Sequence, residues 1–335
     1  MSSTQENRHG ISGAVCCLIA ALAYTAANIC MRQLTAVRCD PFWAIFGREL
    51  VSAMLVGPWV AYRAIRGRPT LPRGRTLGLI LLVGVLIQIP GNIGVQWALG
   101  VVGLAVTIPA VFAVSITIAA TLGFAVLGER VSIRSAAAIA LQLASLGLLA
   151  VGAEAVGQSI AGDRPDFRVG QNGTVLLEAG SPTAIALAVA AAGLAGGVYS
   201  LLNIVIRHSV TRTTLPCAVA FLVPLTALVS IGPVALIRSG VPALSSASFE
   251  EISLMAAGGF FNIIGFLALI FGLQRTTVVH ANVVNASQVA MAAVAGMAIF
   301  AEPPNPWLVA GVVLTIMGIA WIDRPADAFD DIPPP

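Results

Sequence analysis

Two short segments, "AYTAANICMR" at residues 23–32 and "VYSLLNIVIR" at residues 198–207, carry the same pattern. In each, tyrosine, asparagine and arginine follow one another at intervals of four residues, and most of the remaining residues are apolar. An interval of four places side chains on one face of an α-helix. The chain therefore contains two copies of an apolar helix with a polar stripe, 175 positions apart.

The composition indicates that these helices lie in a membrane. Of the 335 residues, 58% are hydrophobic and 10% are charged, and the mean hydropathy is +0.92. An ordinary soluble domain has about 25% charged residues. The formal net charge of +3 comes from arginines that lie mostly at the ends of apolar runs, so we predict no nucleic-acid partner.

The chain contains several apolar runs that are long enough to cross a bilayer, which takes about 20 residues. We predict ten spans, near residues 11–34, 42–64, 76–99, 101–126, 132–152, 182–206, 215–237, 252–273, 276–300 and 306–322. Three of them follow a capping residue and a proline, a favoured helix start: Asp40-Pro41, Ser181-Pro182 and Asn305-Pro306.

Arginine placement orients the spans. The loop "YRAIRGRPTLPRGR" at residues 62–75 contains five arginines, and loops of this kind stay in the cytoplasm. Both termini are then cytoplasmic, residues 153–181 form a periplasmic link, and the acidic, proline-rich residues 324–335 form a disordered cytoplasmic tail. The arginine-only, alanine-rich composition looks bacterial, so we expect a multi-pass protein of the inner membrane.

The similarity between the two halves extends beyond the opening segments. Gly57-Pro58 is matched by Gly232-Pro233 at the same offset of 175. Further on, "LGE" at residues 127–129 corresponds to "FAE" at residues 300–302. Hydrophobic bias alone does not produce matches of this kind, so we interpret the chain as an internal repeat.

Each half holds five predicted spans, the first half at residues 1–152 and the second at residues 182–323. Because five is odd, the second half enters the membrane from the opposite side. We predict an all-α polytopic membrane protein of ten transmembrane helices, built as two inverted five-helix repeats. Such repeats are typical of secondary transporters, which bind substrate near the middle of the membrane and open alternately to each side.

The end of the first half, "FAVLGERVSIRSAAAIALQLASLGLLAVG" at residues 124–152, together with the span count and the repeat, resembles the EamA-like branch of the drug/metabolite transporter superfamily. Arg48, early in the second span, also fits this resemblance. The second half departs from it, because Glu302 lacks the Gly-Glu-Arg context of Glu129 and Val223 is aligned with Arg48. The resemblance implies a central cavity lined by spans 1, 3, 4, 6, 8 and 9, with spans 5 and 10 structural.

Polar residues within spans are costly unless they are satisfied, so they are candidates for substrate binding. We predict as substrate-binding residues Tyr24, Asn28, Asn92, Gln96, Trp97, Tyr199, Asn203, Asn262, Asn285 and Gln288. Hydrogen bonding between helices is the alternative for each of them, and we favour it for Asn282, which points away from Gln288. We interpret Arg32 and Arg207 as interfacial anchors at helix ends.

The charged residues near the spans are predicted to be structural or gating residues. Glu49 points about 100° away from Arg48 on a helix, and we favour a structural pair between Arg48 and a neighbouring helix or loop over direct contact with the substrate. Glu129 and Glu302 are interpreted as turn and helix-start residues that the helix dipole favours. Pro109, inside the fourth span, completes this set.

We therefore expect a secondary transporter that exports a small polar or zwitterionic, amino-acid-like metabolite by alternating access. A multidrug or nucleotide-sugar-type carrier of the same superfamily is the alternative, and a membrane-embedded enzyme a remote one. We expect no enzyme activity, cofactor or metal site, with the substrate and the bilayer as the partners. We expect no acidic residue at the centre of a cavity-lining span, which leaves Glu49 and His280 as poorly placed candidates for ion coupling. Coupling, direction, substrate identity and oligomeric state stay open.

Overall fold

Apolar helices form the described part of the chain, which in this computed structural model comprises residues 3–68, 70–127, 181–210, 215–239 and 247–321, together with parts of 133–151. In the first half the helices are α1 (Ser3–Ala36), α2 (Pro41–Ile65), α3 (Arg75–Leu86), the π-helical η1 (Ile87–Ile93), α4 (Gly94–Val102), α5 (Leu104–Leu122) and the π-helical η2 (Gly123–Leu127). In the second half they are α7 (Pro182–Val210), α8 (Pro216–Ser230), α9 (Gly232–Ser239), α11 (Phe249–Leu273), α12 (Val278–Asn285), α13 (Gln288–Phe300) and α14 (Pro306–Trp321).

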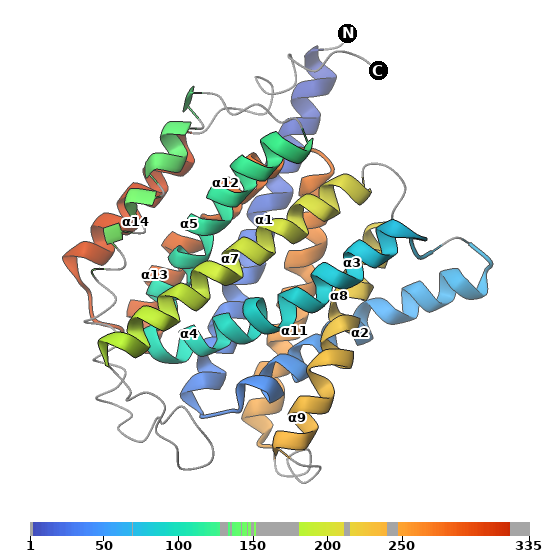
Figure 1. Cartoon of the computed structure of the whole chain (residues 1–335), viewed down its shortest axis with the longest axis horizontal. Coiled ribbons are helices and arrows are strands. Elements are labelled where there is room, and N and C mark those ends of the chain that lie inside the picture. The colour runs from blue at the N-terminus through green and yellow to red at the C-terminus, as the bar shows by residue number, and fades with distance from the viewer. Residues whose placement is uncertain are drawn as a thin grey trace.

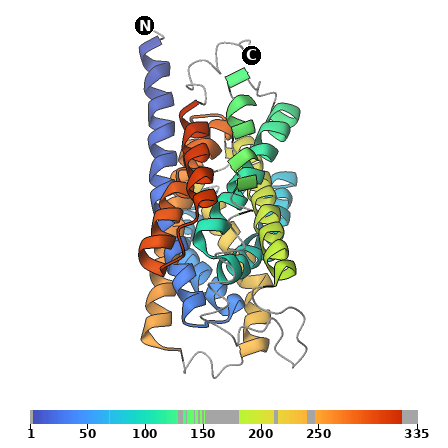
Figure 2. The same cartoon turned by 90° about the vertical axis from the view of Figure 1, so that its left-hand side faces the viewer.

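Eight helical stretches in the described residues are long and apolar enough to cross a membrane. They correspond to eight of the ten predicted spans, so the all-helical, polytopic class is confirmed. The other two predicted spans, near 132–152 and 306–322, coincide with shorter apolar helices at Ala136–Ser145 and Pro306–Gly318. Figures 1 and 2 show that the amino-terminal part of α1 extends beyond the other helices.

The predicted capping residues start their helices as expected. Asp40, Ser181 and Asn305 each accept a hydrogen bond from a backbone N–H in the first turn of the following helix, at 2.9, 3.2 and 2.9 Å. Each is followed by a proline, which needs no N–H partner at the first helical position. These helix starts are therefore determined locally.

Helices from the two halves interleave. α1 packs along α11, while α7 packs along the continuous stretch formed by α3, η1 and α4 (Figure 1). α5 packs against α7 so closely that a methyl group at Gly196 would overlap the carbonyl of Val111. Neither half could therefore keep this arrangement without the other, and the space between them is lined by both.

The third span is interrupted by η1, which contains Pro90. Proline removes an N–H from the helical ladder, and a π-helical turn is a common way to accommodate the gap. Gly91 follows it, and a Cβ there would come within 3.2 Å of the Tyr199 ring. The interruption thus lets α7 bring Tyr199 close to the backbone of the third span.

Candidate functional site

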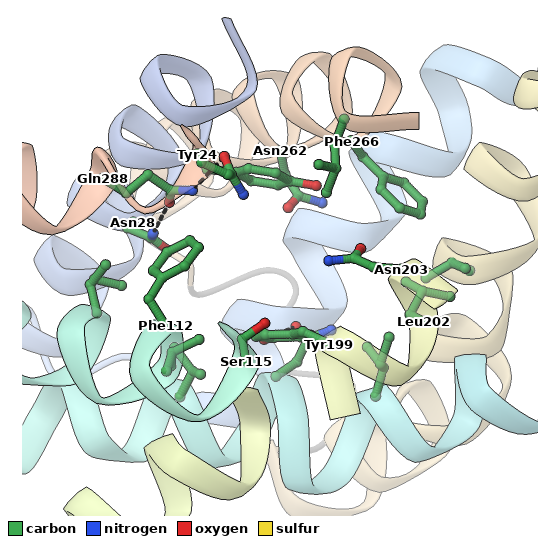
Figure 3. Close-up of a pocket in the computed structure, with 18 of the residues that line it drawn as sticks. Tyr24, Asn28, Phe112, Ser115, Tyr199, Leu202, Asn203, Asn262, Phe266 and Gln288 are labelled. Carbon is green, nitrogen blue, oxygen red and sulfur yellow. Dashed lines mark hydrogen bonds between the residues drawn. The ribbon is translucent and has the colours of Figure 1, made fainter. Parts of the chain in front are cut away.

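A cavity of about 150 Å³ lies among the helices (Figure 3). A buried water needs about 10–15 Å³ of such space, so the cavity can hold several waters or a small solute. All eight candidate spans contribute lining residues, including α2 and α8. The cavity is therefore shared by both halves of the chain, and its lining extends beyond the six spans that the family resemblance implied.

The two copies of the repeated segment meet at this cavity. Tyr24 of α1 and Tyr199 of α7 lie on opposite sides of it, and so do Asn28 and Asn203 (Figure 3). The Tyr24 ring lies against Gly265, where a Cβ would come within 3.0 Å of it. Eight of the ten predicted substrate-binding residues line the cavity: Tyr24, Asn28, Asn92, Tyr199, Asn203, Asn262, Asn285 and Gln288.

One chain of hydrogen bonds starts at the Tyr199 hydroxyl, which donates to Asn92 Oδ1 at 2.9 Å. Asn92 Nδ2 donates to Gln88 Oε1 at 2.7 Å, and Gln88 Nε2 donates to Thr226 Oγ1 at 3.1 Å. Gln88 and Asn92 are both buried. This chain holds α7, η1 and α8 together on one side of the cavity.

A second chain connects α1 to the broken ninth span, which consists of α12 and α13. Asn28 Nδ2 donates to Gln288 Oε1 at 3.4 Å, as the dashed line in Figure 3 shows, and Gln288 Nε2 donates to Asn285 Oδ1 at 2.9 Å. The Asn28 contact is long for a hydrogen bond. A ligand can therefore replace it at little cost.

Asn282 lies at the centre of a third group. Its Oδ1 accepts hydrogen bonds from Asn203 at 3.0 Å and from Ser115 at 3.2 Å. Asn282 thus links helices, which is the role we favoured for it, and it lines the cavity as well. A side chain can bridge helices and face a cavity at once, and spacing within one helix does not reveal this.

The largest correction concerns Arg48 and Glu49. The prediction that Glu49 points away from Arg48 is wrong, because Arg48 Nε donates to Glu49 Oε1 at 3.0 Å. Their long side chains bend toward each other although their Cα–Cβ bonds diverge. Both line the cavity and both are buried, so an acidic residue does face the central space. The sequence feature that could have revealed this pair is two adjacent charged residues inside an apolar run.

Two predicted site residues lie elsewhere. Gln96 Nε2 donates to the Met31 carbonyl oxygen at 3.0 Å, so this amide links α4 to α1. Trp97 is half-buried and packs against the apolar core. Neither lines the cavity. Gln96 is one turn from Asn92, but the π-helical turn between them changes the direction in which the following residues point.

The gating and structural candidates at the end of the bundle also differ from expectation. Glu302 lies at a helix start as predicted, but the helix is α5 and not the one that follows it in the chain: its Oε1 and Oε2 accept from the backbone N–H groups of Leu104 and Ala105 at 2.9 and 3.0 Å. Arg32 is not an interfacial anchor, because it is 4% exposed and its Nε lies 3.3 Å from Glu302 Oε1.

The remaining structural candidates take no part in the cavity as the structure describes it. Pro109 is buried inside α5 and does not line the cavity. Arg207 donates from Nη1 to the Leu273 carbonyl oxygen at 2.6 Å. Glu129 lies outside the described residues.

Comparison with known proteins places the second half of this bundle in a family. Residues 183–323 match the EamA-like transporter family. This half is an EamA-like transporter domain. The resemblance to the drug/metabolite transporter superfamily is thereby confirmed, and the chain is a multi-pass membrane protein of the transport type.

A solved structure titled only "Crystal structure of protein" is similar to the chain as a whole. The similarity covers 92% of this chain and 97% of that one, with a TM-score of 0.62 and 17% sequence identity. At this identity the likeness indicates a shared fold. No curated protein matches the chain.

Proposed function

We propose that the protein is a secondary transporter that exports a small polar or zwitterionic, amino-acid-like metabolite across the inner membrane by alternating access. The observation that carries the proposal is the cavity of about 150 Å³, because both copies of the repeated segment line it. Its amides and tyrosine hydroxyls offer hydrogen bonds to a polar solute, and residues such as Phe112 and Phe266 offer apolar contact. Ligand sites of small molecules combine these two kinds of lining.

Alternating access requires two halves that can exchange roles, and contacts around the cavity support this proposal. Tyr24 of the first half packs on Gly265 of the second, and Tyr199 of the second half packs on Gly91 of the first. The two tyrosines are 175 positions apart and the two glycines 174. The same contact thus occurs twice with the halves exchanged, as a pseudo-twofold axis requires.

A hydrogen bond repeats in the same way. Asn262 Nδ2 donates to Ser52 Oγ at 3.4 Å, and Gln88 Nε2 donates to Thr226 Oγ1 at 3.1 Å. The two donors are 174 positions apart, and so are the two acceptors. Both observations favour two inverted five-helix repeats that enclose the site between them.

The cavity favours a small solute over a nucleotide sugar. Arg48 is the only arginine among its described lining residues, and it is paired with Glu49. A phosphate group would meet the negative charge of Glu49 next to the arginine that should bind it.

The proposal is tested by a thermal-shift screen of the purified protein with amino acids, nucleosides and sugars, followed by solute exchange in proteoliposomes. Binding to the folded state must raise the melting temperature, and a ligand at 100 times its Kd adds about 2.7 kcal/mol of stability. We expect neutral amino acids to stabilise the protein and to exchange across the membrane. Stabilisation without any exchange would show a binding protein that does not transport.

A further inference from the structure

The ion pair in the cavity wall is only partly satisfied. Arg48 donates from Nε and Nη2 to the same oxygen of Glu49, Oε1. Among the described residues, no hydrogen bond reaches Glu49 Oε2 or Arg48 Nη1. A guanidinium carries five N–H donors and a carboxylate has two accepting oxygens. Each member of the pair therefore retains capacity for a further charged partner.

The unused atoms are not sealed inside protein. The side chains of Arg48 and Glu49 are 10% and 4% exposed, and both line the cavity. Neither Nη1 nor Oε2 is among the fully enclosed polar atoms that lack a partner in the described residues. They therefore have contact with open space. Buried charges are costly unless they are paired and hydrogen-bonded, so the contents of the cavity have to supply the missing partners.

The pair is held in place by the contact between α2 and α11. Ser52 Oγ lies 3.1 Å from the Arg48 carbonyl and 3.1 Å from the Gly259 carbonyl. A Cβ at Gly259 would come within 2.5 Å of the Arg48 carbonyl oxygen, so only glycine permits this approach. The backbone beneath the two charges is therefore closely packed, which favours a preformed charge arrangement over an adaptable one.

The rest of the cavity wall is uncharged. Besides Arg48 and Glu49, its described lining residues are amides, hydroxyls, tyrosines and apolar side chains, so the formal charges of the lining sum to zero. Phe112, Phe266 and Leu202 provide apolar surface (Figure 3). A ligand that matches this wall has one positive group, one negative group and an apolar remainder.

We propose that Arg48 and Glu49 are the specificity-determining pair of the transport site. Arg48 binds the carboxylate of a zwitterionic metabolite, Glu49 Oε2 binds its ammonium group, and the apolar part of the ligand lies against the apolar wall. The inference rests on the proposed transport function and adds to it the residues that bind the two charged groups of the ligand. A singly charged ligand satisfies one partner only, and an uncharged ligand satisfies neither.

The test uses four ligands that share one apolar side chain and differ in charge: leucine, leucinamide, N-acetylleucine and N-acetylleucinamide. Each is titrated against the purified, detergent-solubilised protein near pH 7 while binding is followed by the rise in melting temperature. Hydrogen bonds to charged groups contribute about 1.5–3 kcal/mol each. We therefore expect leucine to bind at least about tenfold more tightly than either singly charged relative, with the uncharged one weakest.

The decisive variant is Arg48→Gln/Glu49→Gln, which removes both charges together and leaves no unpaired charge in the wall. Its melting temperature without ligand reports whether it folds. We expect it to lose the preference for leucine over N-acetylleucinamide. The matched control is Arg238→Gln/Asp40→Asn, which removes an ion pair of 3.2 Å that is more exposed and lies outside the cavity lining. This control should keep the wild-type preference.

Any of three results would overturn the inference. The first is a folded double variant that still prefers leucine as the wild type does. The second is a wild-type protein that no leucine form stabilises, and the third is one that binds N-acetylleucine as tightly as leucine. Failure of the transport proposal looks different, because the wild type would then show the charge preference in binding yet exchange no leucine in proteoliposomes.

Discussion

The described residues of the protein contain two buried arginine–glutamate pairs, and they differ in what surrounds them. In the pair Arg32–Glu302, both carboxylate oxygens accept backbone N–H groups of α5, and Arg32 donates from Nη1 to Thr35 as well. Its members are 270 positions apart, and the pair connects α1, α5 and the segment before α14. In the pair Arg48–Glu49, the members are adjacent in sequence and one carboxylate oxygen has no partner among the described residues.

This difference separates a structural role from a functional one. The helix N-terminus that Glu302 caps carries a partial positive charge, which stabilises the carboxylate in addition to Arg32. Gly103 and Gly296 leave just enough room for this carboxylate, since a Cβ at either position would overlap it. The pair Arg32–Glu302 is saturated, because both carboxylate oxygens already have partners, and its close-fitting site leaves no room for a ligand. The unsaturated pair faces open space, which is where a transport site needs charge.

The largest expected effect is all-or-none cysteine labelling. It shows on which side of the membrane the saturated pair, Arg32–Glu302, lies. Arg38 follows α1 shortly after Arg32, and Arg66 follows α2; both are exposed. If the arginine-rich loop is cytoplasmic, a membrane-impermeant maleimide should label Arg38→Cys in intact cells and label Arg66→Cys only after lysis.

The wild type is the control for this labelling. Cys39 should remain unlabelled although it adjoins Arg38. Burial, followed by the negative charges of Glu251 and Asp40, raises the pKa of its thiol to about 12, so the reactive thiolate is scarce at neutral pH. Labelling of Arg66→Cys in intact cells would reverse the proposed orientation.

Removing the saturated carboxylate should cost the most stability. In Glu302→Ala, Arg32 stays buried without its partner and two backbone N–H groups lose their acceptor. Breaking a buried pair in this way lowers the free energy of unfolding by about 3–5 kcal/mol. The measurement is denaturant unfolding in detergent micelles. Glu250→Ala is the control, because this exposed glutamate should change stability by no more than about 0.5 kcal/mol. If Glu302→Ala and Glu250→Ala were equally stable, the structural role assigned to Glu302 would be wrong.

Breaking the unsaturated pair should cost less. Glu49→Gln leaves Arg48 without a counter-charge, but water in the cavity can solvate the guanidinium. We expect a loss of about 1–3 kcal/mol in the free energy of unfolding, and we expect the additional change Arg48→Gln to restore most of it. The same denaturant titration checks both. A loss as large as that of Glu302→Ala would mean that the two pairs play the same role.

The smallest effects are expected at the two tyrosines. Loss of one hydrogen bond to a ligand weakens binding by about 0.5–1.5 kcal/mol, or up to about tenfold, in Tyr24→Phe and in Tyr199→Phe. Tyr199→Phe should also lower the melting temperature, because its hydroxyl donates to Asn92 at 2.9 Å. Leucine titrations of both variants, with melting temperatures measured in parallel, separate the two effects. Earlier melting with unchanged affinity in both variants would make the repeated tyrosines packing residues only.

Much of the fold and part of the cavity lining could be predicted from the sequence, because the signals are local. Apolar runs indicate the spans, capping residues such as Asp40 and Asn305 set helix starts, and polar residues within apolar helices indicate where the cavity lies. The helix that Glu302 caps could not be predicted, since α5 starts at Leu104, 198 positions earlier in the chain.

The failures at Gln96 and Glu49 have a different origin. Both predictions assumed a regular helix and side chains that continue the direction of the Cα–Cβ bond. Gln96 follows the π-helical turn η1, which shifts the register expected of a regular helix, and its amide faces α1 instead of the cavity. At Glu49 the side chain bends back toward Arg48. The attraction between opposite charges is strong inside a membrane protein and outweighs the preference for a straight side chain.

The central claim is that the cavity shared by the two halves is a transport site whose charges select the solute. The most direct test is exchange of radiolabelled leucine into leucine-loaded proteoliposomes that contain either the wild type or the folded Arg48→Gln/Glu49→Gln variant. We expect the wild type to accumulate label and the variant to accumulate little. Unlabelled leucine should compete for uptake by the wild type, whereas N-acetylleucinamide should not. Equal accumulation by the wild type and the variant, or none above protein-free liposomes by the wild type, would contradict the claim.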